Sequence, residues 1–377
     1  MKTTPPTRFG FIPALVALMA LMFPSPANGQ EPSLKEVFAE DFYVGAALNA
    51  YRILEKDDNA RPLIEKHFNT ISPENDMKWE RIHPEEDRYD FKLADRFVEL
   101  GEKHQMYLVA HCLVWHNQTP DWVFEDDNGE LVSRDILLER MRDHIHTVVG
   151  RYKGRIDAWD VVNEAVTDDG ELRKSRWYKI IGEDYIEKAF QYASEADPEA
   201  LLIYNDYSLA GKAKREGTIR MVKKLQSAGI NIGAIGMQAH YQLEDPELDE
   251  VEASIIAFAA LDLEVMITEL DISVLPSPYG SSVAQVNGRF QNSPQLDPYT
   301  SSLPGAVQEQ LAARYKDLFG LFLKHADKIS RVTFWGVDDG TSWKNNHPVR
   351  GRTNYPLLFD RQYRPKPAFE AVVGLRR

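Results

Sequence analysis

The stretch "LEVMITELDI" (263–272) is almost continuously apolar and β-branched until it reaches two carboxylates, Glu269 and Asp271. This composition is typical of a buried strand, on which side chains two positions apart point to the same face. A buried strand that ends in two acids on one face needs a polar neighbourhood at that end. Six other segments of the chain repeat this pattern of an apolar run that closes in polar residues.

Eight segments of the sequence are strand-like, and polar turns separate them from amphipathic helical patterns. The predicted strands are 43–49, 68–75, 106–115, 156–164, 200–207, 234–240, 263–272 and 331–339. Apolar residues also recur at helical spacing in segments such as 90–105, 133–154, 183–197, 214–229 and 307–327. Apolar strands that alternate with such helices indicate a parallel sheet covered by helices, and eight repeats predict an α/β fold, the closed (β/α)8 TIM barrel.

An open, doubly wound sheet is the alternative arrangement of the same elements. Such sheets commonly carry a Gly-rich phosphate loop after the first strand, and this sequence has none. The segment "GKAKREG" (211–217) has neither the spacing nor the Ser or Thr of a P-loop. We therefore expect a single-domain barrel over residues 30–377.

Composition is that of a globular protein with ample material for a core: 377 residues, 43% hydrophobic and 27% charged. Cys112 is the single cysteine, so no internal disulfide can form and stability must come from packing. Because its neighbours are apolar and strand-like, we expect Cys112 to be a small buried hydrophobic residue.

Residues 1–29 resemble a secretory signal peptide. Lys2 and Arg8 precede an apolar run (9–23), and Ala27 and Gly29 have the spacing of a cleavage site before Gln30. A membrane anchor is the alternative, but the run is short for a span of about 20 residues. No cysteine lies at the end of the run, where a lipid would be attached, so a lipid anchor is not expected. The sequence predicts a secreted or periplasmic protein with no membrane association after removal of the signal.

Charge excludes two classes of partner. Loss of Lys2 and Arg8 with the leader leaves 42 basic and 58 acidic residues, a net charge near −16. Such a protein is repelled by nucleic acid and by anionic membrane surfaces. The balance suits a neutral partner, and we expect a monomer.

The segment 276–304 is rich in Pro, Ser, Gly, Asn and Gln and has no strand or helix period. Loops of this length inside compact domains are usually functional or disordered. Because it follows the seventh predicted strand, we expect it to extend or cover a cleft on the catalytic face. A linker between domains is the alternative, but the chain beyond it is too short for a further domain.

The strand ends of a (β/α)8 barrel surround one pocket at the catalytic face. The polar residues at these ends are Glu74, Asn75, His111, Trp115, Asn163, Glu164, Asn205, Asp206, Gln238, His240, Glu269, Asp271 and Trp335. Two carboxylates in a pocket with Trp, Asn and Gln predict glycoside hydrolysis, in which one acid protonates the leaving oxygen and the other attacks C1 or activates water.

Other chemistries lack their usual motifs. His111 and His240 are isolated on their strands, without HxH or HExxH, which disfavours metal-assisted hydrolysis. No GxSxG occurs, and Cys112 is the only thiol, which disfavours a Ser or Cys nucleophile. We expect no metal and no cofactor.

Eight motifs of the chain resemble those of glycoside hydrolase family 10 endo-β-1,4-xylanases, in the family's order and over about residues 34–375. They are "SPENDMKWERIHPEE" (72–86), "AHCLVWHNQTPDWV" (110–123), "AWDVVNEAVTDDGELRKSRWYKIIGEDYIEKAF" (158–190), "IYNDYS" (203–208), "IGMQAHY" (235–241), "ITELDI" (267–272), "FWGVDDGTSW" (334–343) and "PLLFDRQYRPKPAF" (356–369). The resemblance implies a retaining endo-acting enzyme on xylan and xylo-oligosaccharides.

By this resemblance, Glu164 is the general acid/base and Glu269 the nucleophile. The resemblance also implies substrate contacts for Glu74, Asn75, Lys78, His111, Trp115, Gln118, Asn163, Tyr207, Gln238, Trp335 and Trp343. The family uses the residue matching His240 to hydrogen-bond the nucleophile. Asp271, on the same strand face as Glu269, is placed to orient His240 and to favour its protonated form, which lowers the pKa of Glu269.

The chain departs from the family pattern at Ser208, where the family commonly has Asn, and it has no cysteine pair late in the barrel. A related barrel hydrolase that cleaves β-1,4-glucan or mixed glucan is one alternative, because its strand-end carboxylates would be the same. A non-catalytic xylan-binding barrel is the other, but such proteins usually lack one of the two acids.

Overall fold

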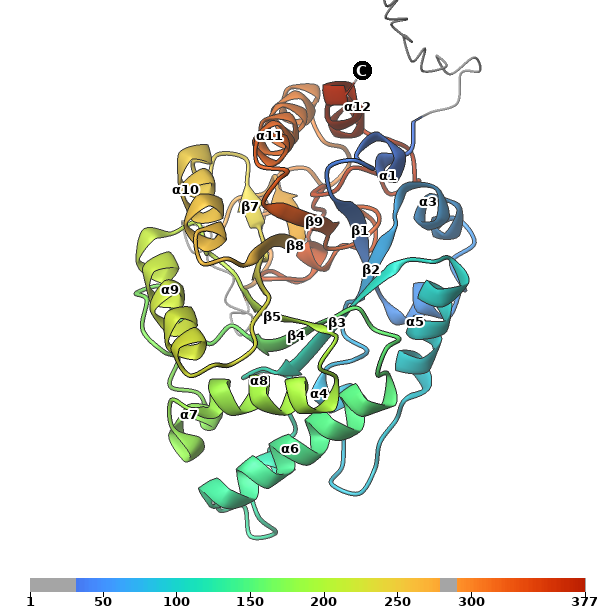
Figure 1. Ribbon diagram of the computed structural model, residues 1–377. Coiled ribbons are helices and arrows are strands. Elements are labelled where there is room, and N and C mark those ends of the chain that lie inside the picture. Colours follow the sequence, from blue (N-terminus) through green and yellow to red (C-terminus); the bar gives the residue numbers. More distant parts are fainter. Residues whose placement is uncertain (1–31, 279–289, 377) are drawn as a thin grey trace, which may run out of the picture. The chain divides into compact units, whose positions relative to one another are not determined.

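The apolar runs of the sequence become parallel strands of one sheet in a computed structural model, which describes residues 32–278 and 290–376 (Figure 1). The residues from Ser33 onward form one compact unit. The predicted signal peptide (1–29) and residues 279–289 of the predicted loop lie outside the described residues.

The strands close into a barrel. Their bounds are β1 Tyr43–Leu48, β2 Thr70–Pro73, β3 Tyr107–Val114, β4 Ala158–Asn163, β5 Leu201–Asp206, β6 Ala234–Met237, β7 His240–Gln242, β8 Glu264–Ser273 and β9 Ile329–Phe334. The order is β6-β5-β4-β3-β2-β1-β9-β8-β7, and the additional pairing of β6 with β8 joins the two ends. The predicted strand 234–240 covers β6 and the first residue of β7. Because β6 and β7 both pair with β8 and follow one another along it, they count as one barrel strand, so eight strands form the barrel and the predicted (β/α)8 fold is confirmed.

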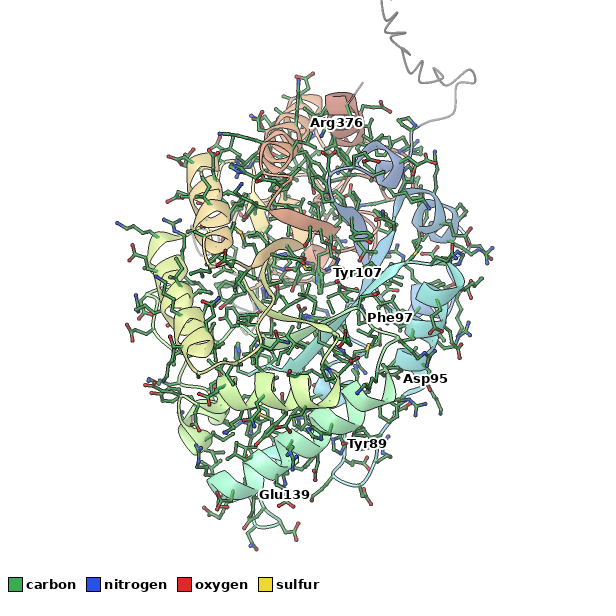
Figure 2. The ribbon with its side chains drawn as sticks, in the orientation of Figure 1. Tyr89, Asp95, Phe97, Tyr107, Glu139 and Arg376 are labelled. Atoms are coloured by element: carbon green, nitrogen blue, oxygen red, sulfur yellow. The ribbon has the colours of Figure 1, made fainter. Side chains whose placement is uncertain are left out.

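Helices form the outer ring around these strands (Figure 1). They are α1 Leu34–Val37, α2 Ala50–Ile53, α3 Ala60–His67, α4 Trp79–Ile82, α5 Lys92–Lys103, α6 Arg134–Arg151, α7 Arg176–Ile181, α8 Tyr185–Ala196, α9 Lys212–Ser227, α10 Leu248–Ala259, α11 Gly305–Lys324 and α12 Pro367–Val373, with 3-10 turns η1 Asp121–Val123, η2 Trp343–Asn345 and η3 Gly374–Arg376. The five predicted helical segments correspond to α5, α6, α8, α9 and α11. Ion pairs on the outer surface join neighbouring helices. Asp95 of α5, labelled in Figure 2, lies 2.7 Å from Arg151 of α6.

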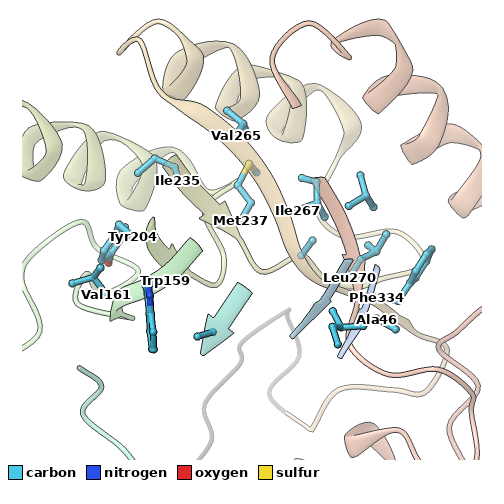
Figure 3. Close-up of a cluster of buried hydrophobic side chains, with 14 of the residues drawn as sticks. Ala46, Trp159, Val161, Tyr204, Ile235, Met237, Val265, Ile267, Leu270 and Phe334 are labelled. Carbon is cyan, nitrogen blue, oxygen red and sulfur yellow. The ribbon is translucent and has the colours of Figure 1, made fainter. Parts of the chain in front are cut away.

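Two sets of apolar side chains pack against the barrel strands, one shared with the helices and one among the strands alone. Strand residues such as Val161, Ile235 and Ile267 belong to the large core shared with the helices (Figure 3). A small separate cluster contains Val109, Ala158, Ile203, Ala234 and Met266, one residue from each of five strands. The second cluster includes no helix residue, which is the packing expected inside the barrel, and it fills the space between the strands.

Two strand predictions need correction. The predicted strand 234–240 is broken at Ala239, whose φ of 61° no strand residue adopts. The predicted strand 331–339 is instead β9 Ile329–Phe334. Beyond it, Gly336 has a φ of 133°, and the Asp338 and Asp339 carboxylates accept backbone N–H groups of the following loop, so the chain turns away from the sheet.

The described parts of the predicted loop 276–304 precede α11. Phe290 forms an isolated bridge with Val349, and the Asp297 carboxylate accepts the N–H of Thr353 at 3.0 Å, so this segment packs against the loop after β9. A role in covering a cleft stays a prediction. None of the helices within 32–278 and 290–376 combines the length and hydropathy of a membrane span.

Candidate active site

A pocket with an empty volume of about 660 Å³ lies at the carboxyl ends of the barrel strands, and we call it the central pocket. Thirteen of the fifteen predicted site residues line it. They are Glu74, Asn75, Lys78, His111, Trp115, Gln118, Asn163, Glu164, Gln238, His240, Glu269, Trp335 and Trp343. The strand ends therefore converge as the (β/α)8 prediction requires; Asp271 and Tyr207 lie outside this lining.

Glu164 directly follows β4 in a left-handed backbone conformation, with a φ of 58°. Such a conformation is uncommon for a residue other than Gly and needs support from its surroundings. The support is a buried hydroxyl: Tyr204 Oη accepts the N–H groups of Ala165 and Val166, each at 3.0 Å. Arg173 Nε donates to the Glu164 carbonyl at 2.8 Å. These bonds fix the turn that directs Glu164 into the central pocket.

The Glu164 carboxyl is buried among neutral donors. Trp115 Nε1 donates to Oε2 at 2.9 Å, and Gln238 Nε2 donates to Oε1 at 3.1 Å. Burial, followed by the negative charge of Asp206 and that of Glu269, raises the pKa of this carboxyl despite the two hydrogen bonds. Glu164 is thereby favoured in its protonated form, which is what a general acid requires.

Glu269 is equally buried but has different partners. Asn205 Nδ2 donates to Oε1 at 2.8 Å, and His240 Nε2 lies 3.1 Å from Oε2. Burial works to raise the pKa of Glu269, but the His240 hydrogen bond and the charge of His111 outweigh it, and the pKa is lowered. The two glutamates therefore have opposite environments, and Glu269 is the ionised one.

Asp271 stands behind His240 rather than in the pocket. It is fully buried, and its Oδ2 lies 3.1 Å from His240 Nδ1 and accepts Trp343 Nε1 at 2.7 Å. Burial opposes a charge on His240, but Asp271 and Glu269 together raise the pKa of the imidazole. Since each ring nitrogen lies 3.1 Å from a carboxylate oxygen, both acids favour the imidazolium form.

Asn205 is a further site residue. The sequence places Asn205 among the polar strand ends but predicts no role for it. Its side chain is fully buried, donates to Asn163 Oδ1 at 3.0 Å as well as to Glu269, and accepts Thr268 Oγ1 at 2.6 Å. Gly236 on β6 leaves the space: a Cβ there would stand 2.4 Å from Asn205 Oδ1. Asn205 thus ties the two strands that carry Asn163 and Glu269.

One wall of the central pocket is polar and cationic. Lys78 Nζ donates to Asn75 Oδ1 and to Gln118 Oε1, each at 3.0 Å, and lies 4.7 Å from the centre of a Trp115 ring. Burial raises the pKa of neighbouring Glu74, and the charge of Lys78 opposes that rise. This wall presents amide, ammonium and carboxyl groups, which suit sugar hydroxyls.

Another part of the central pocket is aromatic. His111 meets the edge of Trp335 with ring centres 5.3 Å apart, and His240 lies 4.8 Å from Trp343. His111 Nδ1 is held at 2.7 Å from Asp160 Oδ2, a buried β4 residue that sequence reasoning leaves out. Aromatic faces bounded by polar groups are suited to sugar rings.

Tyr207 is buried beside the central pocket. Arg173 Nη2 donates to its hydroxyl at 2.8 Å, and Lys214 Nζ lies 3.4 Å from the ring centre. Lys214 also pairs with Asp206 at 2.8 Å. One face of the ring is therefore occupied by a cation, and stacking of Tyr207 on a sugar stays a prediction.

Cys112 is buried, as predicted, and burial raises the pKa of its thiol well above the usual range. Within the described residues no group of three or more His, Cys, Asp and Glu side chains has the arrangement of a metal site.

Comparison with known proteins identifies the family. The model of "Glycosyl hydrolase family 10" matches residues 33–375. The chain is 46% identical to an endo-1,4-beta-xylanase A of Xylanibacter ruminicola over 96% of this chain and 97% of that one, and 46% identical to an endo-1,4-beta-xylanase of Geobacillus stearothermophilus over 91% and 98%. A solved GH10 endoxylanase from a sugarcane soil metagenome superposes with a TM-score of 0.87 at 46% identity, covering 92% of this chain and all of that one. The chain belongs to glycosyl hydrolase family 10.

Proposed function

We propose that the protein hydrolyses internal β-1,4-xylosidic bonds of xylan with retention of configuration, as an endo-1,4-β-xylanase. The family and the relatives, which are named endo-1,4-beta-xylanases, support the substrate and the reaction. The opposite pKa shifts of Glu164 and Glu269 carry the assignment of roles, because double displacement needs one protonated and one ionised carboxyl.

In the first step, Glu164 gives its proton to the glycosidic oxygen while a Glu269 oxygen attacks C1 from the opposite side. The C1–oxygen bond to the leaving sugar breaks, and an ester joins the remaining sugar to Glu269. His240 and Asn205 hold Glu269 in place and ionised until this bond forms. The released chain leaves with the proton from Glu164.

In the second step, water attacks C1 and releases Glu269, while Glu164 takes the proton of the water. The ester carries no negative charge, so the contribution of Glu269 to the raised pKa of Glu164 is lost in the intermediate. The pKa of Glu164 then falls, and the ionised group acts as a base. Trp115 and Gln238 donate to the carboxylate that results.

The remaining lining residues of the central pocket, and Tyr207, are proposed to bind the sugar chain. Asn163 and Gln238 stand beside Glu164, where a substrate hydroxyl next to the cleaved bond would lie. Lys78, Asn75 and Gln118 form one hydrogen-bonded group suited to the hydroxyls of a neighbouring sugar. Trp335 and Trp343 supply apolar surface for the rings.

Azide rescue tests the two roles. Glu269→Ala should abolish turnover and, with azide, form the α-glycosyl azide; Glu164→Ala with azide should form the β-glycosyl azide. Retention also requires roughly 5 to 5.5 Å between the two carboxyl groups. Products of the opposite configuration would exchange the assignments, and an initial sugar product of inverted configuration would exclude double displacement.

Comparison of xylan with carboxymethylcellulose tests the substrate. Release of oligosaccharides from xylan, with little from the glucan, is expected. A glucan carries an extra hydroxymethyl group at C5, for which Trp343 and its neighbours would need to leave room. Preference for the glucan would overturn the proposal, and binding of xylan without hydrolysis would favour a non-catalytic barrel.

We also propose that residues 1–29 are a signal peptide, and that the exported enzyme is a single-domain monomer of residues 30–377. The charge and apolar pattern of the leader supports export. Mass spectrometry of the exported protein should give Gln30 as the first residue, and sedimentation should give the mass of one chain. An intact leader or a dimer would contradict the respective part.

A further inference from the structure

A second cavity adjoins the central pocket and shares His240 with it. We call it the side pocket; its empty volume is about 440 Å³, and its lining comes from residues 240–242, 273–277 and 344–352. Much of this volume is open to solvent, and the enclosed part, about 40 Å³, has room for a small group such as a carboxylate. Of these residues, only His240 has a part in the chemistry described for the central pocket, and the others are available for another role.

Two cationic side chains line the side pocket, and both are nearly buried: Lys344 is 9% exposed and Arg352 5%. Arg352 Nη1 and Nη2 donate to the backbone carbonyls of Pro276, at 3.0 Å, and His347, at 3.2 Å. Its Nε is buried without a partner, and no carboxylate of the described residues forms a salt bridge with it. Asp297 is the acid whose charge acts on Arg352, from a greater distance.

The other polar groups of the side pocket leave the local charge positive. Lys344 Nζ lies 3.6 Å from Asp271 Oδ1, but Asp271 already pairs with His240. Burial and then the charges of Lys344, His240 and Arg352 lower the pKa of His347 to about 4, and its Nε2 is buried without a partner. A buried guanidinium without a counter-charge is unfavourable, so this arrangement is suited to an anion that arrives with the ligand.

Trp343 connects the side pocket with the sugar-binding one. Its ring lies 4.8 Å from that of His240 and stacks on His347 at 4.9 Å with an 8° tilt. A substrate sugar against Trp343 in the central pocket would therefore lie close to the cations. A group attached to that sugar as a branch could reach them without leaving the chain.

We propose that the side pocket binds the carboxylate of an acidic sugar branch on xylan, with Arg352 as its main partner and Lys344 as the second. This inference rests on the proposed function, because it requires the xylan chain in the central pocket. The planar guanidinium suits a carboxylate, with which it forms paired, charge-assisted hydrogen bonds. A neutral branch such as arabinose would leave the Arg352 guanidinium without a salt-bridge partner.

The test compares glucuronoxylan with the same polymer after reduction of its carboxyl groups, which removes the charge and keeps the branch. For the unmodified enzyme, kcat/KM on the charged polymer should exceed that on the reduced polymer about tenfold or more, the effect of a charge-assisted hydrogen bond. Arg352→Met should bring this ratio near one, and Arg352→Lys should leave it in between. Because each ratio is taken within one enzyme, a partial folding defect cancels.

Arg350→Met is the matched control, since Arg350 is exposed and two residues away. It should keep the ratio of the unmodified enzyme. A ratio near one in the unmodified enzyme, or an unchanged ratio in Arg352→Met, would overturn the proposal; equal loss in both variants would do so as well, because it would indicate diffuse attraction. Failure of the proposed function would differ, since no xylan, neutral or charged, would then be cleaved.

Discussion

The division of roles between Glu164 and Glu269 depends on side chains that never touch the substrate. Asp271 is the clearest case, because it acts on the nucleophile only through His240. Sequence reasoning could propose this relation, since Glu269 and Asp271 share a strand face and His240 ends the preceding strand. Asn205 and Asp160 could not be assigned in the same way, because the contacts of β4 with β3 and β5 depend on register shifts that a sequence pattern does not reveal.

Asp271→Asn should move the acidic limb of the kcat/KM profile to higher pH by about one unit. The sign follows from two shifts: Asp271 raises the pKa of His240, and protonated His240 lowers the pKa of Glu269. Without the Asp271 charge, His240 loses its proton more easily, and Glu269 is protonated at a higher pH. Glu264→Gln, at the exposed start of the same strand, is the control. An unchanged profile and turnover would remove Asp271 from the mechanism.

Asn205→Ala should lower kcat roughly tenfold to a hundredfold, because Glu269 loses a hydrogen bond to a charged group. Asn163 loses its donor at the same time, so KM should also rise. Steady-state kinetics on a xylo-oligosaccharide give both values, and Asn231→Ala, at an exposed position, provides the comparison. Kinetics equal to those of the unmodified enzyme would show that Asn205 only fills space.

The barrel strands are predicted well because their apolar composition matches burial on both faces, as in any parallel sheet covered by helices. Their ends are predicted less well. The break at Ala239 has no signal, since alanine is not a turn residue, and "WGVDD" continues the β-like composition beyond Phe334 although two carboxylates redirect it into a loop. The turn after β4 is likewise not visible, because its support, Tyr204, comes from the next strand.

Tyr204→Phe tests that turn. The hydroxyl accepts two backbone N–H groups and donates to Asp206, so its removal should destabilise the fold by about 1 to 3 kcal/mol. A shift of Glu164 by about 1 Å should reduce kcat by up to roughly a hundredfold. Urea unfolding and initial rates measure the two effects. Tyr192→Phe on α8 removes the same hydroxyl from a half-exposed ring; similar losses in both variants would contradict a specific role for Tyr204.

The ends of the barrel domain meet around a buried histidine, whose titration affects the stability of the whole chain. His67 on α3 is fully buried, accepts the N–H of Leu34 at 3.4 Å and contacts Phe359 and Phe369. Burial and then the charges of Lys66 and Lys35 lower its pKa to about 3. The unfolded chain binds this proton near pH 6.5 and the folded protein does not, so stability is lost as the pH falls below about 6.5.

His67→Phe should therefore reduce the fall in stability between about pH 6 and pH 4. A phenylalanine keeps the aromatic contacts and removes the titration, so the variant should lose about 1.4 kcal/mol less per pH unit. Unfolding in urea at several pH values gives the slope. Asp339, with its pKa raised to about 6, acts in the opposite direction in both proteins and cancels in the difference. His146→Phe, at a half-exposed position, is the control; parallel curves for all three proteins would contradict this account.

The left-handed backbone conformation of Glu164 serves catalysis but lowers the stability of the fold. Its positive φ is one that glycine adopts without strain and glutamate does not, and its carboxyl is buried where the charged form is disfavoured. Replacement of Glu164 by Gly would relieve both strains, so the variant without catalysis should also be the more heat-resistant protein. Selection for thermal stability alone would thus remove the catalytic glutamate. The same variant would be a stable protein in which to crystallise an intact xylan chain.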